Sequence, residues 1–482
     1  MSTVIHIERL PSSTGNLIAL SAAAIVVGCV AAAVGLPAIY CLIALSILVI
    51  FAAVALRQPT LTLSAAIWCL GLFPFSWGLK SGVFPKLFGD EVLLVLYLAV
   101  FPFFYFFRRR VWRPGFGSFY LVLAVFLFAQ CVSFIPMEHD LIALRNFIET
   151  CVLGPLLAVL VLQEASNADA ETIGTAIVWL SAVIAALSIL ERIVLRNPIM
   201  EHQLDITYIS PQLAQITNGV YRPYVSFFHP SEAGTFMGLG FPFVLRKVAR
   251  ERSAIYATVL LLVAAGLFIN ATRGVWVGVA AACVLIMPNA LLFMAVAVPA
   301  AAVSAIIGYM ALKDTPFLLR IMDVDHLLSR FVSWQLALNI FSDHPFIGVG
   351  HMQFKQVYLH YVQDLSSVAN FDIAKVYVVD NLYLTVLAEH GAIGLLGVLG
   401  LFIFVFVALG RSRKRLLAAG LSHNASFVRA AQSALAVFAV TGCFADLNLF
   451  TKATKFLFIL VGLGFAMSTP PGAAHEFEPP VR

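Results

Sequence analysis

The residues Pro345-Phe346-Ile347-Gly348-Val349-Gly350 and Asp380-Asn381-Leu382-Tyr383-Leu384 belong to a relatively polar stretch, 312–390, that lies between blocks of almost wholly apolar sequence. A polar insertion of roughly eighty residues is too long for an ordinary connection, and loops of that length are commonly functional. We therefore expect 312–390 to be a large helical loop that covers a functional site at one membrane surface.

The composition of the chain excludes a water-soluble globule. Its 482 residues are 61% hydrophobic and 11% charged, and the mean hydropathy is +0.94. These values predict an all-α polytopic membrane protein with about 12 to 14 spanning helices, since each span needs about 20 apolar residues. The candidate spans are 17–36, 37–56, 60–79, 91–107, 118–136, 147–162, 172–194, 233–245, 254–269, 274–287, 290–312, 391–409, 427–444 and 456–467.

The apolar runs divide the chain into four parts. Residues 1–311 form N-terminal spanning helices and include a loop at 196–232, and 312–390 is the large loop. Residues 391–468 form C-terminal spanning helices, and the Pro- and Ala-rich tail 469–482 is expected to be disordered. The two halves show no internal repeat, which argues against a transporter built from similar halves around a midplane site.

Basic residues indicate the orientation. The clusters at 108–110, 246–252 and 411–415 fall on the side of the predicted topology that also holds Arg57 and both termini. The positive-inside rule assigns that side to the cytoplasm. The loops 137–146, 196–232 and 312–390 are therefore expected outside the cytoplasm.

Four arginines, Arg145, Arg222, Arg273 and Arg330, are predicted on the side that should be poor in basic residues. Each adjoins the end of a span or surface helix, at the depth of a lipid headgroup phosphate. A guanidinium is always charged and offers a donor fork that suits phosphate oxygens. Snorkelling or a structural ion pair is the alternative for any one of them. As a set they predict a phosphate-binding site.

The segment 222–236 bends into a helix after its prolines, so the helix's first-turn amides could hold an anion beside Arg222. Glu232 and His229 are candidates for a base or an orienting partner, and Glu232 could equally be a helix cap. Arg330 precedes residues at helical spacing that are expected to bury one face and fix Arg330 at the helix start: Phe331, Trp334, Leu338 and Phe341.

Asp380 is a candidate base for an attacking hydroxyl, and Asn381 could orient a sugar. The alternative for both is a helix N-cap. His326, His351 and His360 show no metal-ligand spacing, so no metal is expected.

Several of these pieces together resemble the O-antigen ligase and Wzy-type polysaccharide polymerase family, over roughly 268–399. The matching pieces, in order, are Thr272-Arg273-Gly274-Val275-Trp276, Arg330 with Trp334, Asp343-His344-Pro345-Phe346-Ile347-Gly348-Val349-Gly350, Asp380-Asn381-Leu382-Tyr383-Leu384, and Glu389-His390-Gly391-Ala392-Ile393-Gly394. The segment 222–236 resembles the loop before them.

The resemblance implies a multi-pass bacterial inner-membrane glycosyltransferase with its active site facing the periplasm. Its donor would be a glycan on undecaprenyl diphosphate and its acceptor a glycan or lipid-linked sugar hydroxyl, with no cofactor, no metal and an inverting reaction. Membrane lipids and polysaccharide assembly proteins are the other expected partners, and no nucleic acid is expected.

By position, Arg222 and Arg330 look like the arginines that hold the diphosphate, with Asp380, Glu232 and Arg330 as catalytic candidates. Arg273, Arg145, His229, Asn381 and Tyr383 complete the expected substrate site. Ligases that load lipid A core carry a histidine where this chain has Asp380, which favours a polymerase of exopolysaccharide or O-antigen repeat units over a lipopolysaccharide ligase. A lipid-linked sugar flippase and a non-catalytic assembly subunit are the alternatives from other classes.

Overall fold

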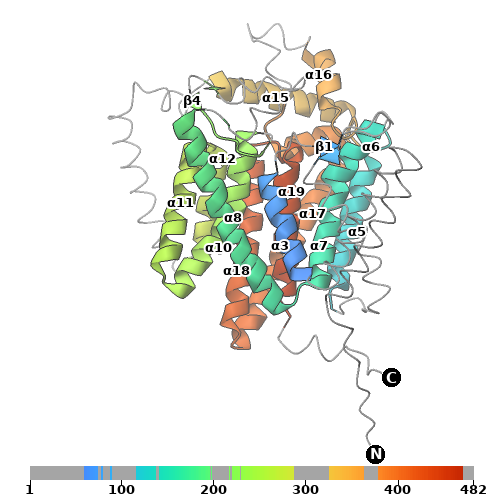
Figure 1. Ribbon diagram of the computed structural model, residues 1–482. Coiled ribbons are helices and arrows are strands. Elements are labelled where there is room, and N and C mark those ends of the chain that lie inside the picture. Colours follow the sequence, from blue (N-terminus) through green and yellow to red (C-terminus); the bar gives the residue numbers. More distant parts are fainter. Residues whose placement is uncertain are drawn as a thin grey trace, which may run out of the picture.

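The computed structural model describes a helical bundle with short loops packed on one end (Figure 1). The residues that it describes are 59–73, 78–79, 87–88, 115–136, 141–195, 197, 216–217, 220–227, 229–286, 325–362 and 378–469. The predicted spans 17–36, 37–56, 91–107 and 290–312 lie outside the described residues, as do the basic cluster 108–110, Arg57 and the tail 470–482.

The described helices are long and apolar, as the composition predicts. The bundle helices are α3 (Pro59–Leu72), α5 (Gly117–Val132), α6 (Leu141–Phe147) continued by a π-helical turn (Ile148–Val152) and α7 (Leu153–Glu164), α8 (Asn167–Val194), α10 (Pro230–Glu251), α11 (Ala254–Asn270), α12 (Arg273–Ile286), α17 (Leu382–Ala418), α18 (Ser422–Gly442) and α19 (Thr451–Ala466). Four stretches in the described part are long and apolar enough to cross a membrane: Leu144–Glu164, Asp169–Val194, Leu382–Ala418 and Ser422–Gly442. The chain is thus an all-α membrane protein.

Strands are minimal in the described part of the chain. β1 (Gly78–Leu79) pairs antiparallel with β2 (Leu87–Phe88), and β3 (Ile216–Thr217) pairs antiparallel with β4 (Val220–Tyr221). Each strand has two residues. They shape loops and do not form a layer of the fold.

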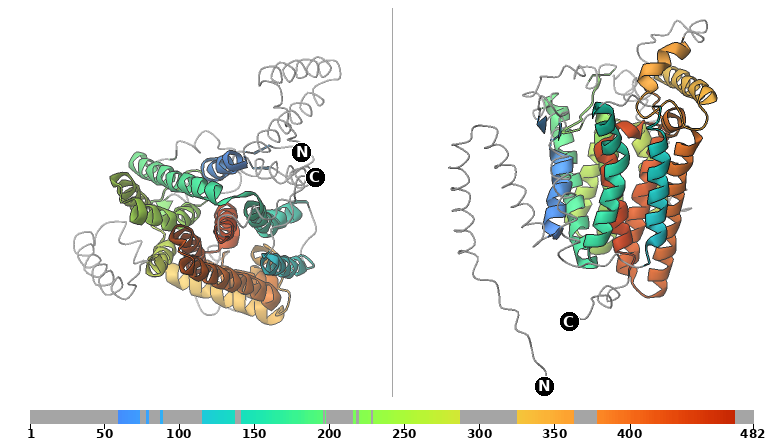
Figure 2. Two further views of the ribbon diagram at one scale, coloured as in Figure 1. Left: turned by 90° about the horizontal axis from the view of Figure 1, so that it is seen from below. Right: turned by 90° about the vertical axis from the view of Figure 1, so that its right-hand side faces the viewer.

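Helix α19 lies at the centre of the bundle, inside the ring of other helices when the molecule is seen along its axis (Figure 2, left). A helix that is apolar on every side is stable only when it is surrounded. Nearly every residue of α19 is buried, and Phe456 stacks on Phe236 of α10 with ring centroids 4.1 Å apart. The two lysines of α19, Lys452 and Lys455, are buried with it.

The two ends of the bundle differ in character. Helices α15 (Asp325–Asp343) and α16 (Phe354–Val362) sit on one end, and α15 lies across the bundle axis (Figure 1). We call this the loop end. The C-terminal residues of α10 and of α17 reach the opposite end and carry the basic runs 246–252 and 411–415, as expected from the sequence. We call this the basic end.

The large loop and the span that follows it are joined by a helix. α17 begins at Leu382, nine residues before the predicted start of the span at Gly391. Gly391 has a φ of 65° and a ψ of −166°, which interrupts the helix at the predicted boundary. Glu389 and His390 therefore belong to a short helical segment in front of the main span.

The expected buried face of α15 is correct only in part: Trp334 is partly buried and its Nε1 donates to the carbonyl of Val379 at 3.0 Å, but two other members of the face are exposed. Phe331 and Leu338 are 58% and 40% exposed. The buried face is instead formed by Ser333, Leu336, Ala337 and Ile340. These smaller side chains allow α15 to approach the start of α17 closely, which leaves the bulkier aromatic face on the outside.

Candidate functional site

Arg330 and Asp380 face each other at the loop end. Arg330 lies within α15, one turn after its start, and not at the helix start as expected. Its Nε is 3.4 Å from Asp380 Oδ2, and the two side chains are 19% and 36% exposed. The Nε is buried and has no hydrogen-bond partner among the described residues, because this contact is too long and poorly directed. The two charges are therefore in contact without a directed hydrogen bond from this nitrogen.

The backbone holds Asp380 in an unusual conformation. Its φ is 50°, in the left-handed region that costs a non-glycine residue about 1 kcal/mol or more. This turn sets Asp380 just outside the helix while Asn381 becomes the N-cap. Strain of this kind is found where the surrounding structure fixes a functional side chain.

Asn381 and Tyr383 make structural contacts. The Oδ1 of Asn381 accepts hydrogen bonds from the backbone N–H groups of Tyr383 and Leu384, at 3.0 and 3.1 Å. The hydroxyl of Tyr383 donates to the carbonyl of Ala439 on α18, at 2.7 Å. The helix-cap alternative therefore describes Asn381, and both side chains anchor the start of α17.

A second carboxyl, which the sequence reasoning missed, is buried beside this pair. Asp446 precedes the 3-10 helix η4 (Leu447–Leu449), and its Oδ1 accepts from the N–H of Asn448 at 3.1 Å. Burial raises the pKa of the Asp446 carboxyl to about 7, and the negative charge of Asp380 adds to the rise. Nothing local in the sequence signals Asp446, since it reaches the site through the packing of α18 and α19 against α17.

Arg222 is buried and firmly held. Its Nε donates to the carbonyl of Asn270 at 3.2 Å, and its Nη2 donates to the hydroxyls of Thr272 and Ser231 at 2.9 and 3.3 Å. Asn270 is fixed in turn, because its Nδ2 donates to the carbonyls of Pro223 and Pro230. The guanidinium is therefore oriented in advance at the junction of α10, α11 and α12.

His229 and Glu232 are likewise engaged with the protein. The Nδ1 of His229 accepts from the N–H of Ser231 and caps α10, while its ring stacks on Phe450 at 5.9 Å. The Oε1 of Glu232 accepts from the N–H of Lys452 at 3.0 Å, at the start of α19. Glu232 is therefore a helix cap, as the alternative interpretation predicted, but it caps α19 and not its own helix α10.

Residues 443–452 join the two halves of the site. The carbonyls of Cys443 and Ala445 accept from Asn381 Nδ2 and Leu382 N at the start of α17. On the other side, Phe444 packs so tightly on Gly274 that a Cβ there would lie 2.6 Å from the Cβ of Phe444. Gly274 follows Thr272, a partner of Arg222. Residues 443–452 thus connect the surroundings of Arg222 with those of Arg330 through a chain of contacts.

The remaining two candidate arginines have different surroundings. Arg273 begins α12 beside Thr272, next to the Arg222 cluster. Arg145 lies on α6, and its Nη2 is 3.1 Å from Glu149 of the π-helical turn. Glu149 also pairs with the fully buried Lys455 of α19, at 3.0 Å. Arg145 therefore belongs to a buried charge network between α6 and α19.

The Pro345–Gly350 turn is bound to α17 through the backbone. The N–H groups of Val349 and Gly350 donate to the carbonyls of Ala388 and Glu389, and those of Ala392 and Ile393 donate to Pro345 and Phe346. Gly348 has a φ of 68°, and a Cβ at this position would lie 2.3 Å from the carbonyl carbon of Glu389. Only glycine allows this approach, which fixes α15 and Arg330 relative to Asp380.

One group of side chains in the described part has donor atoms that could hold a metal: His351, Glu389 and His390, all within 4.8 Å of one another and buried. The sequence reasoning missed it because His351 and His390 are far apart in the chain. The Nδ1 of His351 is 3.1 Å from the Nε2 of His390, and the Glu389 oxygens accept from the N–H groups of Met352 and Phe354. Burial lowers the pKa of His351 to about 4, so the imidazole is neutral. The group acts here as a clasp between the turn and α17.

Comparison with known proteins gives one family. The sequence model of the O-antigen ligase family matches residues 257–399. This stretch includes Asn270, Thr272, Arg330 and Asp380, together with the Pro345–Gly350 turn. A search of the curated proteins finds no match. The family match confirms the resemblance that the sequence predicted.

Proposed function

Because the stretch 257–399 is O-antigen ligase-like, we propose that this chain is an inner-membrane glycosyltransferase that transfers a glycan from undecaprenyl diphosphate to a sugar hydroxyl. The observation that carries the proposal is the Arg330–Asp380 pair, in which a cation for the diphosphate and an acceptor for the hydroxyl proton lie 3.4 Å apart.

The arginines supply the electrostatic part of the reaction. A glycosyl diphosphate leaves readily once its growing negative charge is neutralised, and guanidinium groups can do this without a metal. Arg222 is oriented in advance by Asn270, Thr272 and Ser231, and Arg330 has an Nε free of hydrogen bonds to the described residues. We assign the diphosphate to these two residues, with Arg273 beside Arg222 as a third cation.

Asp380 is the base. The acceptor hydroxyl oxygen attacks the anomeric carbon, the bond from that carbon to the diphosphate oxygen breaks, and its electron pair stays on the diphosphate. The hydroxyl proton passes to the Asp380 carboxylate, and the configuration at the anomeric carbon inverts. Asp380 is preferred over Glu232 because Glu232 accepts from the N–H of Lys452 and holds the start of α19. When the diphosphate binds Arg330, the ion pair opens and frees Asp380 for the acceptor.

The loop end is assigned to the periplasm. The basic runs of α10 and α17 lie at the opposite end, and basic residues favour the cytoplasmic side of spanning helices. Lipid-linked glycans are assembled into polymer outside the cytoplasm in this family, so the assignment brings donor and site to the same surface. The exposed apolar side chains of α15, Phe331 and Leu338, are suited to the membrane boundary there.

The proposal is more specifically a Wzy-type polymerase of exopolysaccharide or O-antigen repeat units. Asp380 occupies the position where lipid A core ligases have histidine. This difference favours a sugar hydroxyl of a growing glycan over lipid A core as the acceptor. An O-antigen ligase that uses lipid A core or another acceptor is the alternative within the same chemistry.

A lipid-linked sugar flippase is the alternative from another class. The buried pair of Lys455 and Glu149 favours it, because charges inside a membrane bundle often mark a transport path. Lys455, however, lies four residues after the start of α19, or about 6 Å along the helix at 1.5 Å per residue. This places the pair near the loop end and not at the midplane, where transport sites are formed.

The experiment is an assay of the purified full-length chain in proteoliposomes with a radiolabelled undecaprenyl-diphosphate glycan. Longer glycans on the lipid identify a polymerase, and transfer of label to a second lipid or protein identifies a ligase. Translocation of the donor without a new glycosidic bond identifies a flippase and overturns the proposal. The reaction should persist in a chelator, since the arginines carry the charge.

A further inference from the structure

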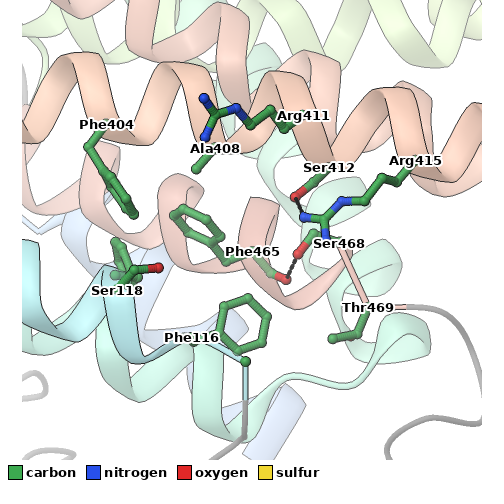
Figure 3. Close-up of a pocket in the computed structure, with 12 residues that line it drawn as sticks. Phe116, Ser118, Phe404, Ala408, Arg411, Ser412, Arg415, Phe465, Ser468 and Thr469 are labelled. Atoms are coloured by element: carbon green, nitrogen blue, oxygen red, sulfur yellow. Dashed lines mark hydrogen bonds between the residues drawn. The ribbon is translucent and has the colours of Figure 1, made fainter.

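A cavity of about 320 Å³ opens at the basic end, far from Arg330 and Asp380. It forms where the start of α5, the C-terminal half of α17 and the end of α19 converge (Figure 3). Its lining residues are Gly115, Phe116, Ser118, Phe119, Phe404, Ala408, Arg411, Ser412, Arg415, Phe465, Ser468 and Thr469. None of them has a role in the proposed glycosyl transfer.

One face of α17 gives the cavity a charged rim and an apolar interior. Phe404, Ala408, Arg411 and Arg415 recur at spacings of three and four residues, which places them on the same face of a helix. At 1.5 Å per residue, Phe404 lies about 16 Å and Ala408 about 10 Å deeper along the axis than Arg415. The helix positions of the two arginines therefore lie nearer the basic end than those of Phe404 and Ala408.

Aromatic rings close the interior of the cavity. Phe465 packs on Phe119 with ring centroids 4.4 Å apart and on Phe116 at 6.0 Å. In Figure 3 the rings of Phe404, from α17, and Phe465, from α19, point into the cavity between these two helices. These rings offer an apolar surface to a hydrocarbon chain and no hydrogen bonds to a small polar solute.

The rim offers cations without compensating acids. Arg415 Nη2 donates to Ser412 Oγ at 3.2 Å, which fixes one edge of its guanidinium, while the side chain of Arg411 extends from the same helix toward the Ala408 side of the cavity (Figure 3). No Asp or Glu is among the described residues that line the cavity. Two guanidiniums on one helix face are suited to a phosphate group, since each can donate two parallel hydrogen bonds.

We propose that this cavity binds an anionic phospholipid of the membrane, with the headgroup phosphate held by Arg411 and Arg415 and an acyl chain lying against Phe404 and Phe465. A lipid phosphate and a free phosphate would use the same guanidiniums. The aromatic interior favours the lipid, because only an amphiphile can occupy both regions at once. Basic pockets between spanning helices are known positions for acidic lipid headgroups.

Arg413 provides a matched control within the same basic run. It carries the same charge and lies two residues from each cavity arginine, and it is not among the lining residues. Loss of one arginine at 413 changes the general attraction of the basic end for acidic lipids, whereas loss at 411 or 415 also removes a specific contact.

The test uses native mass spectrometry of the full-length chain released from nanodiscs that contain phosphatidylglycerol or phosphatidylcholine. We expect phosphatidylglycerol to remain bound to the wild type and to Arg413→Gln, and its occupancy to fall about tenfold in Arg411→Gln and in Arg415→Gln. Equal loss in the Arg413→Gln variant would mean diffuse attraction and would overturn the proposal. Equal retention of phosphatidylcholine would overturn it as well.

A second variant keeps every charge and blocks the interior. Ala408→Phe adds a ring inside the cavity and should lower phosphatidylglycerol retention with the arginines intact. Inorganic phosphate is the probe for the competing source of the anion. If millimolar phosphate raises the melting temperature of the wild type as much as phosphatidylglycerol does, and Ala408→Phe leaves that rise intact, the site binds a free anion and the lipid assignment fails. Only variants with the wild-type elution volume and helical circular dichroism are compared, so that loss of lipid is not caused by misfolding.

Discussion

Arg222 and Arg330 are the same residue type at the same end of the bundle, but the protein holds them in opposite ways. Arg222 is 6% exposed and is fixed by Asn270, Thr272 and Ser231. Arg330 has a buried Nε without a hydrogen bond to the described residues and a long contact to Asp380. The difference teaches that position along the sequence cannot separate a cation that the protein orients firmly in advance from one that it holds by a single long contact.

The largest expected effect is on turnover when Arg330 is replaced. Arg330→Lys keeps the charge but loses the planar donor fork, so we expect glycan transfer to fall about 100- to 1000-fold, as when one preorganised donor is removed. The melting temperature should stay close to that of the wild type, because few contacts within the protein are lost. Full polymer synthesis by this variant at normal protein levels would exclude a bidentate phosphate contact.

A somewhat smaller effect is expected for Asp380. Asp380→Asn preserves the shape of the turn but removes the proton acceptor, and loss of a general base typically lowers the rate by about 100-fold or more. The fall should appear in kcat. If KM alone rises while kcat is unchanged, Asp380 only orients Arg330, and another group takes the proton.

The turn that supports Arg330 can be tested with two glycines. Gly348 and Gly420 have φ values of 68° and 74°, but only Gly348 has backbone atoms within 4 Å of a would-be Cβ. Gly420→Ala should cost about 1 kcal/mol from its conformation alone. Gly348→Ala should cost about 2 to 5 kcal/mol, since overpacking adds to the same strain. Thermal unfolding of both variants measures the difference, and equal costs would contradict the close approach of the turn to α17.

Arg222 should affect stability more than Arg330 does. Arg222→Lys loses the hydrogen bonds that the guanidinium makes to Asn270 and Thr272, and a bond to a charged group contributes about 1.5 to 3 kcal/mol. We expect a clear fall in melting temperature, together with reduced transfer. A variant that melts like the wild type but is inactive would show that Arg222 and Arg330 do not differ in the way described.

The smallest effect concerns pH. His351 has a pKa of about 4 in the folded protein and 6.5 as its ordinary value, so between these pH values the unfolded chain binds more protons. Stability therefore rises with pH across this window and falls on acidification, by at most about 1.4 kcal/mol per pH unit for this group. His351→Gln should flatten the dependence of melting temperature on pH between 7 and 5. An unchanged pH dependence in this variant would contradict the burial of a neutral imidazole at His351.

The spans that follow residue 115 were largely predictable. An apolar run longer than a turn or two must be buried or face lipid. The position of the run in the sequence therefore predicts the centre of the helix. The predicted spans 254–269 and 274–287 differ from α11 and α12 by one residue at each end or less. The buried face of α15 was not predictable, because aromatic residues at helical spacing satisfy either the protein core or the membrane boundary.

The candidate site was predictable in its residue types and not in their partners. Glycines and prolines at 345–350 signal a tight turn, since few other residues adopt its backbone, but the 40-residue separation of this turn from Glu389 conceals the clasp. Asp446 and Lys452 gave no signal, because a lone charge near a helix end is common. Asn381 is the N-cap of α17, because its side-chain oxygen reaches the backbone N–H of Tyr383, two residues further on.

The sequence by itself determined that the chain is a membrane-embedded helical bundle, that its basic runs 246–252 and 411–415 share one end, and that its middle resembles the O-antigen ligase family. These properties follow from hydropathy, charge and local turn chemistry, which act over a few residues. Only the tertiary structure decided that residues 443–452 contact the surroundings of both Arg222 and Arg330, and that Arg222 is fixed while Arg330 is paired with Asp380. Those outcomes depend on contacts between helices that are far apart in the chain. The residues around any one position do not reveal such contacts.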